Sequence, residues 1–482
     1  MKSRKELTIM QMNDSHAYFE LHTELFWSGN RAEYRMAGGY ARIAGALAAA
    51  RKENPGRVLA FDNGDTIHGT RAAVATQGGA LLPLLNRLGF DAMTAHWEFA
   101  YGPQHLKEFA LGLHYPLLAI NCYDNETGKL VFPPYLVKEV NGVRAGIIGI
   151  ASNIVDKVMP ASYSAGVRFT LGNEELPGYI AQLRNDEKAD IVIVVSHLGF
   201  PQEMKLAQEV PGIDVLLSGH THNRLYRPAF SGRTILIQSG CHGSFLGRLD
   251  LTIENKRVAD FRHRLLVMEE AVAPDPEVER MIGEVLKPYR EELNRTAGYT
   301  GTALNRNTIL ESTMDNFLLQ SLCDASGTRL AFSNGWRYGA PVPEGPVSVN
   351  DLYNIVPMDP PVETVDITGD EIRTMMEESL ERTFARDPYL QMGGYVKRCR
   401  GINVYFKMEN PKGYRVQELF IGGERAKPDK TYTAAFVTSQ GVPKGFGTNR
   451  RKTGINAVEA MQRYLSKKKT VHAELQGSVT AV

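Results

Sequence analysis

The chain has 482 residues, which is too long for one ordinary hydrophobic core, so its length predicts two domains. Its hydrophobic content of 43% and charged content of 23% are typical of globular proteins. The 55 Lys and Arg residues nearly balance the 54 Asp and Glu residues, so charge gives no indication of a nucleic acid or an anionic membrane as partner. The longest apolar runs, such as Ile191–Val195, are far too short to span a bilayer.

The N-terminus is basic, from Met1 to Lys5, but the strand-like run Leu7–Met12 follows it in place of the apolar core of a signal peptide. The sequence therefore predicts a cytoplasmic protein, although a trimmed export leader would make it periplasmic. The cysteines form neither a CxxC pair nor a disulfide framework, which favours a reducing compartment. They are Cys122, Cys241, Cys323 and Cys399.

Short apolar runs alternate with helical spacing over the first 270 residues, a pattern that predicts a layered α/β domain. Several of the runs are apolar on both faces, as strands in a covered sheet are. The expected strands are Leu7–Met12, Val58–Phe61, Asp91–Thr94, Leu117–Ile120, Ala145–Ile150, Ile191–Val195, Val215–Leu217 and Thr234–Gln238. The expected helices are Tyr40–Lys52, Leu81–Leu88, Gln104–Leu113 and Glu174–Arg184.

The character of the sequence changes near Ala273-Pro-Asp-Pro276, where prolines precede an amphipathic helix expected over Glu277–Leu293. We predict an N-terminal domain over residues 1–272, a connecting helix over 273–297 and a C-terminal domain over 298–482. The last part has Gly and Pro clusters between strands and helices, which indicates a mixed α+β domain. Its expected helices are Thr313–Ala325, Gly369–Phe384 and Gly454–Leu465.

Five of the expected strands end on side chains that can bind a metal. These side chains are Asp14 and His16, Asp65, His96, His197, and His220 with His222. Because the carboxyl ends of strands in an open α/β sheet meet at one crevice, residues two hundred positions apart can converge there. Carboxylate and imidazole ligands suit Mn, Fe or Zn better than Ca. Asp65 follows Gly64, which allows a close backbone approach, and is the candidate to bridge two ions.

Each of these motifs also has an ordinary structural interpretation. Taken alone, Asp14 is more typical of a turn residue, and His96 of a buried core histidine. Gly219-His-Thr-His222 is only moderately specific. Five matches in one order at strand ends are nevertheless improbable by chance, so the set predicts a dinuclear metal site.

The order Asn13-Asp-x-His, Gly64-Asp, a His-Glu site, Ser196-His-x-Gly and Gly219-His-Thr-His resembles the 5′-nucleotidase family of calcineurin-like metallophosphoesterases. Glu311–Ala325 and Asn334-Gly-Trp-Arg337 are similar to that family's C-terminal domain. The resemblance implies a four-layer α/β sandwich followed by an α+β domain. It also implies two ligand sets, one of Asp14, His16, Asp65 and His222 and the other of Asp65, His96, His197 and His220.

The sequence departs from the nucleotidase pattern at Ala95-His-Trp-Glu-Phe-Ala-Tyr-Gly102. His96 replaces the family's metal-binding Asn and can still ligate, whereas Trp97 replaces a His that assists the reaction and cannot transfer a proton. This stretch and Asp387-Pro-Tyr-Leu-Gln-Met-Gly-Gly394 resemble the SoxB-type thiosulfohydrolases, dimanganese enzymes that release sulfate from a carrier-bound cysteine S-thiosulfonate. The alternative interpretation is that Trp97 is a substitution that affects only packing, and that another group supplies the proton.

The resemblance implies a metal-dependent hydrolase with Asp65, His96 and Trp97 at its catalytic centre. It also implies two divalent ions, for which Mn is the first choice and Zn or Fe are alternatives. We expect Asn334 and Arg337 to bind a small phosphate ester, nucleotides being the family's usual substrates. One alternative is a SoxB-like enzyme acting on a thiol-bearing carrier protein, and another is a weakly active metal-holding scaffold. No nucleic acid or membrane partner is expected.

Three further features have two interpretations each. The aromatic-rich segment Tyr18–Tyr34 is either a lid over the crevice or a surface insertion. Arg398 and Arg400 either meet an anionic substrate or are solvated charges. Cys241-His242 belongs either to the core and its loops or, through His242, to the surroundings of the site.

Overall fold

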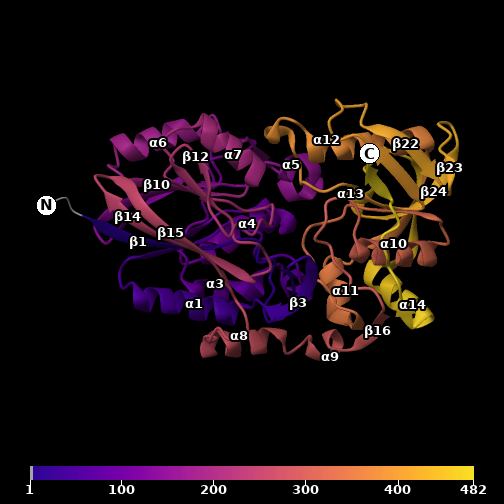
Figure 1. The fold of residues 1–482 in the computed structure, drawn as a ribbon, viewed down its shortest axis with the longest axis horizontal. Coiled ribbons are helices and arrows are strands. Elements are labelled where there is room, and N and C mark those ends of the chain that lie inside the picture. Colours follow the sequence, from indigo (N-terminus) through magenta and orange to yellow (C-terminus); the bar gives the residue numbers. More distant parts are fainter. Residues whose placement is uncertain (1–3) are drawn as a thin grey trace. The chain divides into compact units, whose positions relative to one another are not determined.

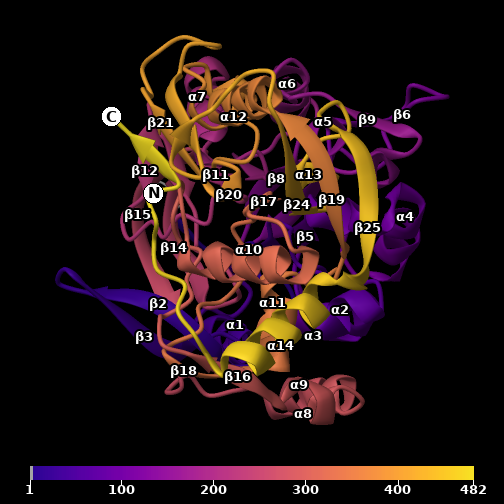
Figure 2. The same cartoon turned by 90° about the vertical axis from the view of Figure 1, so that its right-hand side faces the viewer.

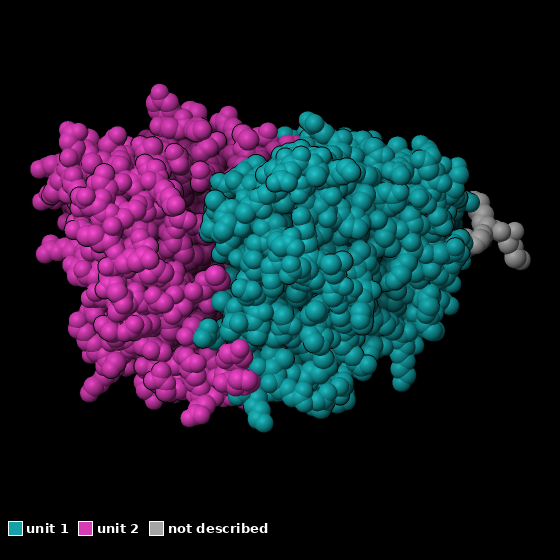
Figure 3. All heavy atoms as spheres, turned by 180° about the vertical axis from the view of Figure 1, so that it is seen from behind, with its two compact units in different colours: residues 1–22, 36–287 teal, residues 23–35, 288–482 magenta. Residues whose placement is uncertain are grey.

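The computed structural model describes residues 4–482 and divides the chain into two compact units, coloured separately in Figure 3. Unit 1 comprises Met1–His22 and Met36–Lys287, and unit 2 comprises Thr23–Arg35 and Pro288–Val482. The basic residues 1–3 of the sequence lie outside the described residues. Each unit is described by itself below.

Unit 1 contains two sheets. The first has the order β15 (Arg257–Val267), β14 (Phe245–Glu254), β1 (Lys5–Met12), β4 (Val58–Asp62) and β5 (Ala92–Met93). The second has the order β12 (Ala229–Ser231), β13 (Thr234–Ile237), β11 (Val215–Leu217), β10 (Ile191–Ser196), β8 (Val143–Ile150) and β7 (Tyr135–Val140). In the first sheet β1, β4 and β5 are parallel, and in the second β8, β10, β11 and β13 are parallel.

The two sheets share one apolar core, which contains Ile9 and Phe61 from the first sheet and Ile193 and Leu217 from the second. Helices α1 (Tyr40–Glu53), α3 (Leu82–Leu88) and α8 (Pro276–Leu286) pack together on one side. Helices α6 (Leu176–Asn185) and α7 (Phe200–Glu209) lie on the opposite side, with the strands between (Figure 1). The predicted four-layer α/β sandwich is therefore confirmed.

Three expected elements differ from the structure. The single helix predicted over Glu277–Leu293 is two, α8 and the short α9 (Arg290–Leu293), because Pro288 lacks a backbone N–H and disfavours helix at the residue before it. Leu117–Ile120 makes one isolated bridge, between Met93 and Leu117, and is not a full strand. The helix expected from Gly454 begins at Ala457, since the preceding residues finish a strand.

Unit 2 contains three larger sheets. The five-stranded sheet has the order β20 (Arg398–Arg400), β17 (Leu330–Ser333), β24 (Thr431–Val437), β19 (Pro361–Thr368) and β25 (Thr448–Asn456). The four-stranded sheet has the order β23 (Glu424–Arg425), β22 (Val416–Ile421), β21 (Ile402–Phe406) and β27 (Val479–Ala481). The three-stranded sheet has the order β18 (Gly345–Ser348), β16 (Thr296–Thr300) and β26 (Thr470–Val471). The segment predicted as a lid or an insertion forms a hairpin, β2 (His22–Ser28) and β3 (Arg31–Ala37).

Helices cover the five-stranded sheet of unit 2. Helices α10 (Thr313–Ser326) and α14 (Ala457–Lys468) lie side by side against it (Figure 2). Helix α12 (Gly369–Phe384) buries Ile372 and Met376 in a core shared with the five-stranded and four-stranded sheets. Its start is fixed by a capping box in which Thr368 and Glu371 each bind the other's backbone N–H. Within residues 4–482, no helix is long and apolar enough to cross a membrane.

Candidate metal centre

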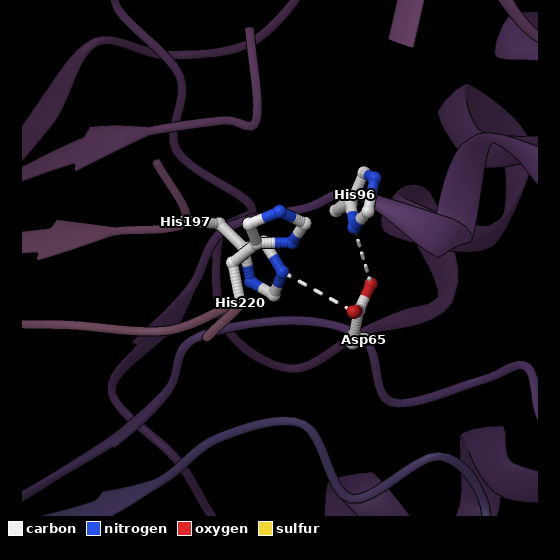
Figure 4. Close-up of side chains that lie close together, drawn as sticks. All are labelled: Asp65, His96, His197 and His220. Atoms are coloured by element: carbon white, nitrogen blue, oxygen red, sulfur yellow. Dashed lines mark ion pairs between the residues drawn. The ribbon is translucent and has the colours of Figure 1, made fainter. Parts of the chain in front are cut away.

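The seven side chains predicted as metal ligands meet at the carboxyl edge of the parallel strands of unit 1. They form two groups, Asp65 with His96, His197 and His220, and Asp14 with His16, Asp65 and His222. Within each group one ligand atom of every residue lies within 4.8 Å of those of the others. Figure 4 shows the first group, with His96 and His197 each joined to Asp65 by a dashed line. The sequence thus located a convergence that spans more than two hundred residues.

Asp65 belongs to both groups. Its Oδ1 lies 3.0 Å from His96 Nδ1, and its Oδ2 lies 3.3 Å from His197 Nε2 (dashed in Figure 4) and 3.7 Å from His16 Nε2. In the second group, His222 Nε2 lies 3.2 Å from both Asp14 Oδ1 and His16 Nε2. Asp65 is therefore the residue that the two groups share.

The backbone at this edge is unusual. Five of the seven side chains sit on residues with positive φ: Asp14 at 51°, His16 at 48°, Asp65 at 57°, His220 at 69° and His222 at 58°. Such a conformation costs about 1–2 kcal/mol for a residue with a Cβ, so the surrounding contacts must hold it. Gly64 is required beside Asp65, because a Cβ there would lie 2.7 Å from the carbonyl oxygen of Thr94. Strain of this kind is typical of functional sites.

Two residues that the sequence analysis did not select as site residues hold the ligand loops in place. Glu98 accepts hydrogen bonds from the backbone N–H groups of Asp65 (3.2 Å), Thr66 (2.6 Å) and His96 (2.8 Å). Asn63 donates its amide to the carbonyls of Ser196 and Leu217 and so ties β4 to the second sheet. The positions of these residues, beside predicted ligands in Asp62-Asn-Gly-Asp65 and His96-Trp-Glu98, were the only signal available in the sequence.

Backbone carbonyls also orient two of the imidazoles. His197 Nδ1 lies 2.5 Å from the carbonyl oxygen of Asn63, and His16 Nδ1 lies 3.3 Å from that of His68. A carbonyl accepts only, so each Nδ1 carries the hydrogen and each Nε2 presents its lone pair to the cluster. Asp14 is held by the backbone N–H of His220 at 2.9 Å and by the amide of Asn13 at 2.7 Å.

The electrostatics of the cluster favour ionised carboxylates. Burial by itself would raise the pKa of Asp65, but His96 and His197 nearby lower that pKa well below its ordinary value. Burial lowers the pKa of the His16 imidazole well below its ordinary value, which keeps that ring neutral and able to ligate.

The donor set fits divalent cations. Nε2 of His96 is buried and has no hydrogen-bond partner among the described residues, whereas Nδ1 of His96 and Nε2 of His197 lie 3.0 Å and 3.3 Å from the carboxylate oxygens of Asp65. The latter two nitrogens face Asp65 in a cluster that also contains the carboxylate of Asp14. The mixture of imidazole nitrogen and carboxylate oxygen suits Mn, Fe or Zn.

Trp97 lies beside this cluster and is 8% exposed. Its backbone N–H donates to Asp65 Oδ1 at 2.8 Å, and its indole stacks on the ring of His68. The indole has no group that can transfer a proton to a leaving group. His242 is also nearby, with its ring centroid 6.2 Å from that of His16 and 6.1 Å from that of His222.

Unit 2 brings together the two residues predicted to bind substrate. Asn334 and Arg337 follow the carboxyl end of β17, and both approach Tyr395. The amide of Asn334 donates to the Tyr395 hydroxyl at 3.2 Å, and the Arg337 guanidinium lies 5.4 Å from the centroid of the Tyr395 ring.

Neither interpretation of Arg398 was right. This side chain is buried and binds Asp315 Oδ2 at 3.1 Å and the carbonyl of Thr308 at 2.7 Å, so it is neither solvated nor available to a substrate. Arg400 donates to the Gln476 side chain at 3.1 Å. Side chains at alternating positions of a strand point to opposite faces. The sequence pattern did not show that Arg398 lies on the buried face of β20 or that Asp315 is its partner there.

The chain is similar in sequence to 5′-nucleotidases and to a related phosphoesterase. Residues 290–440 match the model of the 5′-nucleotidase C-terminal domain. The chain is 24% identical over 89% of its length to the trifunctional nucleotide phosphoesterase YfkN of Bacillus subtilis, and it spans 31% of that protein. It is 22% identical to a 5′-nucleotidase of Vibrio cholerae (89% of this chain, 83% of that one) and 24% identical to that of Bos taurus (98% and 90%).

Two solved structures share the fold along nearly the whole chain. The sulfate thiohydrolase SoxB of Thermus thermophilus superposes with a TM-score of 0.91 at 24% identity, covering 99% of this chain and 96% of that one. A 5′-nucleotidase precursor of the same species superposes with a TM-score of 0.85 at 23% identity, covering 99% of both chains. The predicted resemblance to both branches is confirmed.

Proposed function

Because the chain is related to the 5′-nucleotidases and shares the fold of 5′-nucleotidases and SoxB, we propose that it is a hydrolase that uses two divalent metal ions to cleave a phosphate monoester. The observation that carries the proposal is the pair of ligand groups that share Asp65. In this proposal residues 1–272 form the metal-binding domain, 273–297 the connecting segment and 298–482 the substrate-binding domain.

We assign one ion to Asp14, His16, Asp65 and His222 and the other to Asp65, His96, His197 and His220. Manganese is the first choice of metal, with zinc or iron as alternatives, since the donors combine oxygen and nitrogen. When bound, two such ions activate water near neutral pH and stabilise the charge that develops on the attacking and leaving oxygens.

The chain's own residues position the reactants. The buried Asp65 would ligate in both sites, and Glu98 holds the backbone that presents Asp65 and His96. Trp97 closes one side of the centre to bulk water without offering a proton. We propose that Asn334 and Arg337 bind the oxyanion of the substrate, for which a guanidinium fork has matching geometry.

The second candidate function is a SoxB-like reaction that releases sulfate from a cysteine S-thiosulfonate on a carrier protein. Trp97 favours it specifically, because an alkoxide leaving group benefits from a proton donor, whereas a persulfide is acidic enough to leave without one. A cytoplasmic location suits the nucleotide candidate, and a periplasmic location suits the carrier candidate. A weakly active scaffold is disfavoured, since a decayed site loses ligands first and all seven are present.

A substrate screen tests these functions directly. Manganese-loaded protein is incubated with nucleoside monophosphates, an aryl phosphate and a small S-thiosulfonate, and phosphate and sulfate release are measured. Phosphate release supports the first function and sulfate release the second. Neither product from any substrate, at full metal content, would contradict both. The Asp65→Asn protein, treated identically, controls for contaminating phosphatases.

A further inference from the structure

The Trp97 indole has a stacking partner in the ligand loop itself. The ring of His68 lies nearly parallel to it, at an interplanar angle of 9° with the ring centroids 4.8 Å apart. His68 comes three residues after Asp65, in the segment between β4 and α2 (Arg71–Ala75). Both rings are buried. A parallel stack at this separation is an attractive geometry for two aromatic rings.

The His68 ring is itself fixed from behind. Its Nδ1 lies 3.2 Å from the hydroxyl of Tyr101, and that hydroxyl donates to the carbonyl of Ile67 at 3.2 Å. Gly69 allows the backbone to pass close to His16, because a Cβ on Gly69 would lie 2.4 Å from the His16 carbonyl. These contacts hold the His68 ring in one orientation. The ring therefore contacts the Trp97 indole in a fixed position.

Trp97 is bounded on further sides. Tyr163, in the 3-10 turn Ala161–Ser164, packs against the indole at an interplanar angle of 70° with centroids 6.2 Å apart. The ring of His96 approaches it with a centroid distance of 5.8 Å. The backbone N–H of Trp97 is bonded to Asp65 Oδ1. Of these neighbours, His68 is the one whose ring lies flat against the indole.

We propose that His68 is a positioning residue that holds the Trp97 indole flat beside the metal centre. Through this contact the side of the centre next to His96 becomes a fixed wall that excludes water and gives no proton to the leaving group. The inference rests on the proposed function and deepens it, because it names the residue that keeps the departing group beside an apolar surface. The backbone carbonyl of His68 orients His16, and substitution of the His68 side chain leaves that carbonyl in place.

A pair of variants separates stacking from the other roles of the side chain. His68→Phe keeps a planar ring, and His68→Leu fills a similar volume without one. Both remove the contact with the Tyr101 hydroxyl, so any difference between them reports the stack. If His68→Leu does not fold, His68→Met takes its place. Tyr101→Phe, which removes only a hydroxyl, controls for the loss of that polar contact.

Tryptophan fluorescence follows Trp97 without requiring a substrate. The chain has three tryptophans, and Trp27 is 66% exposed, so the variants are made in a Trp27→Phe background. Subtracting the spectrum of the same protein with Trp97→Phe removes the contribution of the buried Trp336. Acrylamide quenching of the difference signal then measures how well Trp97 is shielded, and metal content is measured on the same samples.

The proposal predicts that His68→Leu raises the quenching constant of Trp97 about twofold or more, while His68→Phe stays near the native value and both retain full metal content. For the best substrate, His68→Leu is expected to lower kcat about fivefold and His68→Phe less than twofold, the size of effect that one ring contact supports. Equal quenching in the native, Phe and Leu proteins would overturn the inference. So would a Phe variant as exposed as the Leu variant.

The fluorescence and kinetic readouts fail independently. If no substrate is turned over by the native protein, the proposed function fails, while the quenching comparison still decides whether His68 positions Trp97. If the native protein is active and the Leu and Phe variants have equal kcat values, the positioning role has no bearing on the reaction, and the inference is wrong although the proposed function stands.

Discussion

Each unit buries a cluster of charged side chains, and the two clusters are built differently. In unit 2, Asp315 is bound by Arg306 and Arg398, at 2.9 Å and 3.1 Å, and by the hydroxyl of Ser312 at 2.6 Å. The arginines donate their remaining hydrogens to backbone carbonyls such as those of Tyr338 and Thr308. Burial by itself would raise the pKa of Asp315, but the two guanidinium groups lower it.

The candidate metal centre of unit 1 is also buried, but its carboxylates are paired in a different way. Two carboxylates face five imidazoles, and within residues 4–482 the buried Nε2 of His96 has no hydrogen-bond partner. Five of its residues also adopt strained positive φ. A buried network of ion pairs between carboxylates and guanidinium groups stabilises a fold, whereas a cluster that gathers carboxylates and imidazoles suits a cation from outside the chain. This difference separates a structural cluster from a functional one.

The comparison predicts that removing Asp65 damages function before stability. Asp65→Asn takes an ionised ligand from both proposed ions and leaves their mutual repulsion uncompensated. We expect kcat/KM to fall about a thousandfold or more, or about 4 kcal/mol of transition-state stabilisation. The measurement is steady-state kinetics on the best substrate from the screen. An Asp65→Asn protein with native kcat/KM would show that Asp65 does not bridge.

The matching change in unit 2 should damage stability and leave the metals in place. Asp315→Asn leaves two buried guanidinium groups without their carboxylate, and breaking such a network costs about 3 kcal/mol or more. Urea unfolding should show this loss, while elemental analysis finds native metal content. Arg400→Gln is the control, since that side chain makes a single bond to Gln476. If Asp315→Asn unfolds at the native urea concentration, the network is not structural.

Substitution of Trp97 tests how strongly the reaction depends on the stability of the leaving group. Without a proton donor at this position, aryl phosphates and S-thiosulfonates should be cleaved much faster than nucleoside monophosphates. Trp97→His should narrow the gap between aryl and alkyl phosphates about tenfold, which corresponds to about 1.4 kcal/mol. Kinetics with AMP and an aryl phosphate measure it. Native protein that cleaves both equally well would show that another group, such as His242, supplies the proton.

Lys397 gives a smaller, pH-dependent effect in unit 2. Its amine is buried and donates to the carbonyl of Gln440, and burial lowers its pKa from 10.5 to about 7. Above pH 7 the unfolded chain binds a proton that the folded chain does not, so folding becomes more favourable as the pH rises from 7 toward 10.5. The gain is at most about 1.4 kcal/mol per pH unit.

Urea unfolding of the native protein between about pH 6 and pH 9 measures the pH dependence of Lys397. Lys397→Met, which has no titrating group, should remove its share of the slope. Identical slopes in the two proteins would mean that Lys397 is charged in the folded state at neutral pH.

The sequence predicted most of the elements that carry the centre. Apolar runs such as Ile191–Val195 identify the parallel strands because both faces are covered, and the polar residues after them identify the ligands. Helix α12 was predicted over its full length, Gly369–Phe384, and the capping box of Thr368 and Glu371 in the structure accounts for its start. The strands β14 and β15 were missed, because exposed charges interrupt the apolar pattern of β15 and the pairing with β1 depends on distant residues.

What surrounds the ligands was harder to predict. Glu98 and Asn63 bind backbone N–H and carbonyl groups, which every residue has. Their roles therefore produce no characteristic residue pattern in the sequence. Asp14 and His16 have positive φ, and their backbone N–H groups donate to the carbonyls of Gly64 and Asp65 in another segment. His68 gave no signal, because a histidine that stacks on a tryptophan cannot be distinguished in sequence from any other loop histidine.

Metal stoichiometry tests the central claim most directly. The purified protein is dialysed against Mn²⁺, passed through a desalting column and analysed for metal and protein together, beside Asp65→Asn and the unit 2 variant Asp315→Asn. The account predicts two manganese ions per chain in the native and Asp315→Asn proteins and fewer than two in Asp65→Asn. One ion or none in the native protein, or two firmly bound ions in Asp65→Asn, would contradict it.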